Sequence, residues 1–161
     1  MTKYLLVLTA ISVLFMGGVV FPLNAQAQQA TLSISPSSGN FSVGTEFTAT
    51  ITVNSGSTNI NAVAAYISYP SNILQVISVD ATGSALAFVA EKKAEGGIVK
   101  ISGGTPTPGF SGAKNVGSVR FRVVAAGTAS LSYAAGSAVL TDVGNSNIFN
   151  AVGSVAASYE T

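Results

Sequence analysis

The chain has no cysteine, no histidine and no tryptophan, and only 8% of its residues are charged. Without cysteine and histidine it cannot carry Ser–His or Cys–His nucleophile pairs, thiol chemistry or the usual zinc sites. Glycoside hydrolysis needs only two carboxylates, but they must flank the scissile bond. The chain has six acidic residues, and most of them stand at expected strand ends or turns. We therefore expect no catalytic residues and no enzymatic activity.

The sequence also has few clustered carboxylates that could bind a metal ion through oxygen. Calcium prefers several clustered oxygens, commonly including two or more carboxylates. No D-x-D run occurs, and the segment 142–147 (DVGNSN) offers one carboxylate, that of Asp142, with several amides. This segment is a weak calcium candidate and is better interpreted as an Asn/Gly turn. We expect neither a metal nor another cofactor.

The first 27 residues are typical of an export signal. Lys3 gives a positive start, residues 5–20 are almost continuously apolar, and Pro22 precedes the small-x-small pattern of residues 25–27. This pattern predicts cleavage after Ala27 and a secreted or cell-surface protein. The apolar run approaches the ~20 residues that span a bilayer, so an uncleaved N-terminal membrane anchor is the alternative.

Residues 28–161 form a segment of ordinary single-domain size, which does not need disulfides to bury an adequate core. Without Lys3, basic and acidic residues are equal in number. Such a neutral, sparsely charged domain has no electrostatic footprint for nucleic acid or anionic lipid. We expect no nucleic-acid partner, and membrane contact only through an uncleaved N-terminus.

After the signal, short runs of alternating apolar and polar residues are separated by Gly, Ser, Asn and Pro. This pattern predicts half-buried strands joined by turns. Strands without intervening helices must pack sheet on sheet or close on themselves, so the expected fold is an all-β, nine-stranded sandwich with Greek-key or jelly-roll connections. Nine or ten strands are expected, at residues 31–35, 46–53, 60–69, 73–79, 85–92, 98–102, 116–124, 128–133, 137–141 and 151–159.

The order of these segments resembles that of a cohesin domain. Residues 42–48 (SVGTEFT) are similar to the family's "VG-x-x-F" opening, and residues 63–79 to its central strand, tyrosine, turn and following strand. Residues 96–104 are similar to the next "G-x-I-x-I-S" strand, and residues 117–123 and 126–131 to the family's C-terminal strands. The resemblance covers residues 31–159.

The resemblance implies a nine-stranded jelly roll related in fold to some carbohydrate-binding modules. It also implies a scaffolding role, because cohesins hold dockerin-bearing proteins, often polysaccharide-degrading enzymes, on an extracellular scaffold. The family's binding surface is a flat sheet face that includes the strand ending in the core tyrosine, which corresponds to Tyr69 here.

Strand alternation assigns the faces of that strand. With Tyr69 inward, Ala62, Ala64, Tyr66 and Ser68 point outward. Many dockerin-binding cohesins carry Asn or Asp at the positions that correspond to the two alanines. The family's Asp after the core tyrosine is also replaced, by Pro70. The expected binding face is therefore less polar than in those cohesins.

Three functional hypotheses follow. The first is a protein-binding module that holds a dockerin-like or other partner on the face bearing Tyr66. The second is a carbohydrate-binding module in which Tyr66 and Phe110, the latter in the Gly/Pro-rich segment 103–115, stack on sugar rings. The third is a structural envelope or adhesion component that associates with itself.

Overall fold

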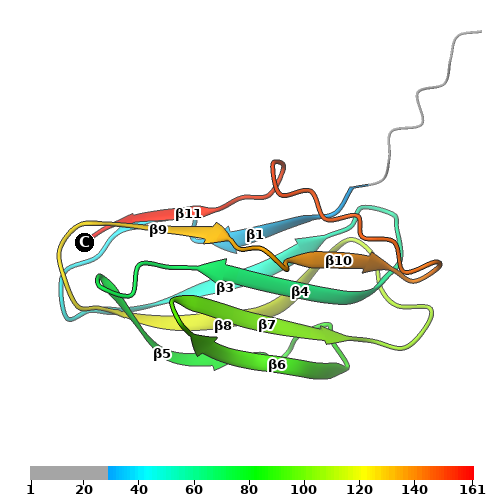
Figure 1. The fold of residues 1–161 in the computed structure, drawn as a ribbon, viewed down its shortest axis with the longest axis horizontal. Helices are drawn as coiled ribbons and strands as arrows, with labels where there is room; N and C mark the ends of the chain where they lie inside the picture. The colour runs from blue at the N-terminus through cyan, green and yellow to red at the C-terminus, as the bar shows by residue number, and fades with distance from the viewer. Residues whose placement is uncertain (1–28) are drawn as a thin grey trace, which may run out of the picture.

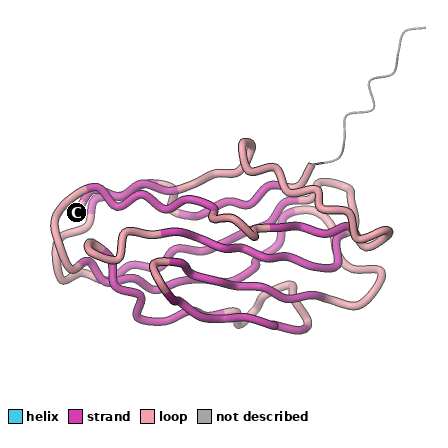
Figure 2. Tube along the Cα trace, viewed as in Figure 1, coloured by secondary structure: helices cyan, strands magenta, loops and turns pink. Residues whose placement is uncertain are grey.

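The computed structural model describes residues 29–161, and the predicted signal or anchor lies outside these residues. Every regular element in the described part is a β-strand, and no helix there is long and apolar enough to cross a membrane. The strands form two sheets that lie one behind the other, with loops collected at the two ends (Figures 1 and 2). This arrangement confirms the expected all-β sandwich.

The smaller sheet has four antiparallel strands in the order β1-β3-β8-β5. Strand β3 pairs with β1 on one side and with β8 on the other, so the longest strands occupy the centre. The bounds are Thr31–Ser35 for β1, Glu46–Asn54 for β3, Ala113–Val123 for β8 and Leu74–Asp80 for β5.

The larger sheet has seven strands, and its main path runs β2-β11-β9-β4-β7-β6. Strand β10 pairs with the first part of β4, whereas β9 pairs with its last two residues. The bounds are Ser38–Asn40 for β2, Ala157–Glu160 for β11, Thr128–Tyr133 for β9, Ile60–Ser68 for β4, Ile98–Gly104 for β7, Phe88–Glu95 for β6 and Ala138–Thr141 for β10.

One apolar core fills the space between the sheets, because each strand turns every second side chain inward. Phe121 and Tyr159 are among its largest fully buried side chains. The ring of Tyr159 meets Phe47 edge to face, with 4.7 Å between centroids, and its hydroxyl donates to the Pro36 carbonyl at 2.7 Å. The core therefore satisfies the polar atom of its largest buried residue.

The observed strands differ from the expected ones at several boundaries, and β6 lies three residues later than the expected strand 85–92. The described residues hold eleven strands, because residues 38–40, which lie between two of the expected strands, form β2. This segment pairs in parallel with β11, and its turn-forming residues are held by backbone hydrogen bonds that do not depend on side-chain type. The last strand is also shorter than expected and begins at Ala157 instead of residue 151.

Candidate functional site

Strand β4 alternates as predicted between the core and the outer face of the larger sheet. Val63, Ala65 and Ile67 are buried. Ala62 and Ala64 lie on the other face and are half-buried, as are Tyr66 and Ser68. The outer face of β4 is therefore built from small residues around one aromatic side chain.

An apolar groove of about 310 Å³ lies on this face, lined by Ala62, Ala64, Phe88, Gly104, Ala138 and Leu140 among other residues. The lining comes from β10, β4, β7 and β6, four strands that lie next to one another in the larger sheet. The groove exists because the central strands carry alanine and glycine here, whereas the phenylalanine stands on the edge strand. We call this feature the apolar groove.

Phe88 is the largest exposed side chain of the groove, with 68% of its surface accessible. It is opposite Gly104 in the pairing of β6 with β7, and Gly104 is in turn opposite Ala62 on β4. At the neighbouring Gly103, a Cβ atom would lie 2.1 Å from the Phe88 carbonyl oxygen, so only glycine allows β6 to approach this closely. Phe88 falls within the expected strand 85–92, and no binding role was expected for it.

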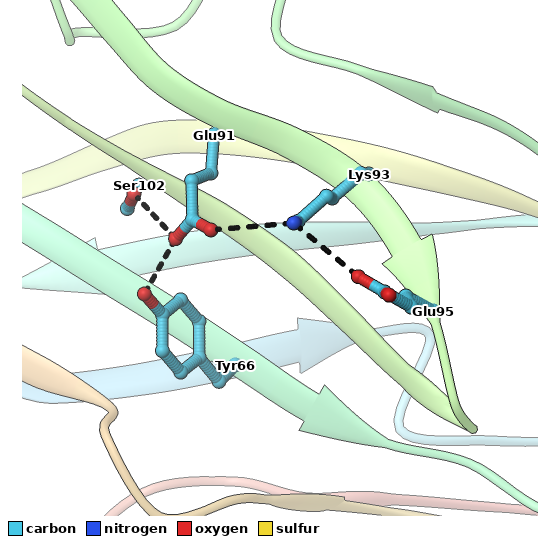
Figure 3. A network of polar contacts seen from close by, with 5 residues as sticks. All are labelled: Tyr66, Glu91, Lys93, Glu95 and Ser102. Carbon is cyan, nitrogen blue, oxygen red and sulfur yellow. Dashed lines mark hydrogen bonds and ion pairs between the residues drawn. The ribbon is translucent and has the colours of Figure 1, made fainter.

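A polar network borders the groove and is centred on Glu91 (Figure 3). The Tyr66 hydroxyl donates to Glu91 Oε2 at 2.6 Å, and the Ser102 hydroxyl donates to the same oxygen at 3.3 Å. Lys93 Nζ lies 3.9 Å from Glu91 Oε1 and 3.3 Å from Glu95 Oε2. We call these five residues the Tyr66–Glu91 network.

The network holds Glu91 as a carboxylate. The hydrogen bond from Tyr66 is the main cause that lowers the pKa of Glu91 below its ordinary value. The same bond raises the pKa of Tyr66, because it stabilises the protonated phenol. At neutral pH, the groove is therefore bordered by the Glu91 carboxylate and by Lys93, with Lys100 Nζ 5.5 Å from the centre of the Tyr66 ring.

Tyr66 is held in place by the segment between β9 and β10. Ser137 Oγ accepts from the Tyr66 backbone N–H at 3.2 Å and donates to the Tyr66 carbonyl at 3.1 Å. A Cβ atom at Gly136 would lie 2.9 Å from the Cδ2 and Cε2 atoms of the ring, so this segment lies against one edge of the ring. The ring is therefore partly covered.

The remaining site residues of the sequence analysis lie elsewhere. Ser68 is on the same face at the far end of β4, paired with Ser132 and Ile98. Phe110 forms a bridge with Ile60 and packs against the core. Because Ile60 and Tyr66 are six residues apart on one strand, about 20 Å separates the two positions, and Phe110 and Tyr66 do not form one aromatic platform.

Among residues 29–161, no three His, Cys, Asp or Glu side chains lie close enough together to hold a metal ion. On the outer face of the smaller sheet, Glu46 is paired with Arg120 and Arg122, and hydrogen bonding to Arg122 is the main cause that lowers its pKa. Glu91 and Glu95 share Lys93. These acids are thus partners in ion pairs, an arrangement typical of strand surfaces.

No family model and no curated protein matches the chain. Solved structures do match. A non-cellulosomal cohesin from the archaeon Archaeoglobus fulgidus is 20% identical, with a TM-score of 0.66 over 82% of this chain and 90% of that one. The seventh ScaB type I cohesin of Pseudobacteroides cellulosolvens is 19% identical, with a TM-score of 0.66 over 82% and 91%.

A third match is a chain of a type I cohesin–dockerin complex from Clostridium thermocellum, 13% identical, with a TM-score of 0.64 over 82% of this chain and 98% of that one. The matched chains are thus covered almost completely. The likeness confirms the resemblance at the level of fold: residues 29–161 have the cohesin fold.

Proposed function

We propose that this cohesin-fold protein is a non-catalytic binding module that holds another protein on the outer face of its larger sheet. The partner would cover the apolar groove and the adjoining Tyr66–Glu91 network. The observation that carries the proposal is the apolar groove, in which the exposed Phe88 stands beside a floor of alanine and glycine, since a contiguous exposed apolar patch is typical of a contact surface.

The composition of the face supports a protein as the partner. Protein interfaces commonly combine an apolar centre with a polar rim that carries hydrogen bonds. Here the groove supplies the centre. Tyr66, Glu91 and Lys93 supply a rim whose charges are already ordered by one another. An ordered rim loses little side-chain entropy when the partner binds.

The partner class follows from the fold relationship. Several cohesins of similar structure were solved in complex with dockerins, and we propose a dockerin-like partner here. Ala62 and Ala64 stand where many cohesins carry hydrogen-bonding residues. We therefore propose that this partner is recognised mainly by apolar contact, and that its central side chains are aliphatic or aromatic.

The proposed setting is extracellular. The signal-like segment 1–27 supports export, with secretion after cleavage at Ala27 or tethering through an uncleaved N-terminus as the two outcomes. The scaffolding of polysaccharide-degrading enzymes is the accompanying proposal. This proposal rests on the role of cohesins in general. The chain itself supports it only through its fold and the proposed binding face.

A fragment of residues 28–161 contains every strand of the described sandwich and serves for the test. Proteins captured by this fragment from the culture medium of the source organism are identified, and each purified candidate is titrated calorimetrically against the fragment. We expect saturable 1:1 binding by at least one of them. In parallel, the fragment is passed over insoluble cellulose and chitin.

Retention on a polysaccharide without any titratable protein partner would replace the proposal by the carbohydrate-binding hypothesis. Elution of the fragment as oligomers from a sizing column, again without a partner, would favour self-association. Binding of neither kind would contradict the proposed function.

A further inference from the structure

Two buried side-chain oxygens at one end of the larger sheet have no hydrogen-bond partner. They are Asn61 Oδ1 and Asp142 Oδ1, and among residues 29–161 only the amide oxygen of Asn115 shares this condition. An unpaired buried oxygen lowers stability, and does so more when it belongs to a charged group. Native structures usually satisfy such atoms with water or an ion.

The residues that carry these two oxygens lie where the end of β10 meets the beginning of β4. In the pairing of β10 with β4, Leu140 is opposite Ala62 and Thr141 is opposite Ile60, so Asn61 is the extra residue of a bulge. The next residue, Asp142, donates its backbone N–H to the Asn59 carbonyl at 2.9 Å. The turn after β10 and the beginning of β4 thus meet at one end of the sandwich (Figure 1).

A third side-chain oxygen reaches the same place. Asn61 Nδ2 donates to Asn145 Oδ1 at 3.4 Å, and Asn145 has a positive φ of 49°. Thr141 fixes the turn: its hydroxyl donates to the Val143 carbonyl at 2.8 Å and accepts from the Ser146 N–H at 3.0 Å. The turn therefore holds its oxygens in position without a ligand.

We propose that Asp142, Asn61 and Asn145 bind a calcium ion at this strand end. Carboxylate and amide oxygens are the ligands that Ca²⁺ prefers, and water completes its flexible coordination shell of six to eight oxygens. One carboxylate implies weak binding, and extracellular modules typically bind Ca²⁺ with Kd of about 10⁻⁴–10⁻³ M. Mg²⁺ is a poorer fit, because it demands near-octahedral geometry and releases water reluctantly.

Sequence spacing alone does not reveal this site. Segment 142–147 contains only Asp142 and neighbouring amides, whereas the second orphaned oxygen comes from β4, 81 positions earlier. The bulge at Asn61 brings the two segments together. The site is independent of the proposed partner-binding function, because it requires neither the apolar groove nor a bound protein.

The test compares thermal unfolding of the 28–161 fragment in EGTA, in 10 mM CaCl₂ and in 10 mM MgCl₂ at one ionic strength. With a Kd of about 1 mM, 10 mM Ca²⁺ multiplies the folding equilibrium constant by about 11. That factor corresponds to a rise in Tm of about 3–5 °C for a domain of this size. Calorimetric titration with CaCl₂ should give one site per chain.

Asp142→Asn should abolish the calcium response. Without calcium, it should leave stability unchanged or raised, because the amide places no charge at this buried position. If Asp142 only supported the fold, Asp142→Asn would instead lower the Tm equally with and without calcium. Asp80→Asn removes a carboxylate from the exposed end of β5 and serves as the matched control that keeps the response.

Three results would overturn the proposal. They are an unchanged Tm with calcium, an equal rise with magnesium, and an equal calcium response in Asp142→Asn. In each of these cases the two oxygens are satisfied by ordered water or by rotated Asn61 and Asn145 amides.

Discussion

Adjacent alanines on β4 provide a sharp test of which face of this strand is free. Ala65 is fully buried between the sheets, opposite Ile101 on β7. Ala64 points to the apolar groove and is opposite Ser102. Both positions lie on one strand, so the difference between the two Ala→Asp variants reports mainly the environment of the side chain.

The magnitude for Ala65→Asp follows from its burial. In a dry core, the new carboxyl must stay protonated, which at pH 7 costs about 4 kcal/mol against an ordinary pKa of ~3.9. The added volume costs about 1–3 kcal/mol more in a packed core. The sum, about 5–7 kcal/mol, is comparable with the whole stability of a typical domain. Ala64→Asp should cost no more than about 1 kcal/mol.

Urea unfolding of the two variant fragments, followed by circular dichroism at pH 7 and pH 5, measures the difference in their free energies of unfolding. The Ala65→Asp variant should be largely unfolded at pH 7. It should recover about 1.4 kcal/mol for each pH unit toward the unfolded-state pKa, because its folded-state pKa is raised and the native state then keeps a proton that the unfolded state releases. Equal losses for Ala64→Asp and Ala65→Asp would refute the assigned faces.

Other consequences can be measured on the same fragment. Tyr159→Phe should lower the free energy of unfolding by about 1 kcal/mol in a urea titration, because it removes the hydrogen bond that the buried hydroxyl donates to the Pro36 carbonyl; an unchanged midpoint would show that this hydrogen bond adds nothing to stability. Glu46 has a lowered folded-state pKa, so its contribution to stability is present above its unfolded-state pKa and is lost as pH falls through the folded-state value. Urea midpoints between pH 3 and pH 7 should show this loss in the wild type and less of it in Glu46→Gln, and identical profiles would contradict it. Tyr66→Phe should raise the pKa of Glu91 toward its ordinary value in a carboxylate NMR titration, since the phenol is the main cause of the lowering; an unaltered Glu91 titration would contradict the hydrogen bond.

The faces of β4 were predictable from the sequence, because a period of two is a local property of extended backbone. One strand position, Tyr69, was enough to place Val63, Ala65 and Ile67 inward, and the structure buries all three. The sandwich was predictable for a similar reason, since alternating strands without helices have few ways to bury their apolar faces.

Features that depend on strand pairing were not predictable. Phe88 belongs to the groove only because β6 pairs with β7 in a register that sets it opposite Gly104. The 38–40 segment is a strand only because β11 lies beside it. Asn61 meets the turn after β10 through a bulge between distant segments. Each feature is set by a non-local register that no short window of sequence contains.

The most direct test of the proposed binding face is the affinity of an identified partner for two matched variants. Ala64→Asp places a carboxylate in the apolar groove, whereas Thr50→Asp places one on the outer face of the smaller sheet, opposite Ser118. We expect Ala64→Asp to weaken calorimetric binding about 30-fold or more, the loss typical of an interface centre, and Thr50→Asp to change it by less than about twofold. A partner that binds Ala64→Asp as tightly as the wild type, and loses affinity for Thr50→Asp, would contradict the assignment.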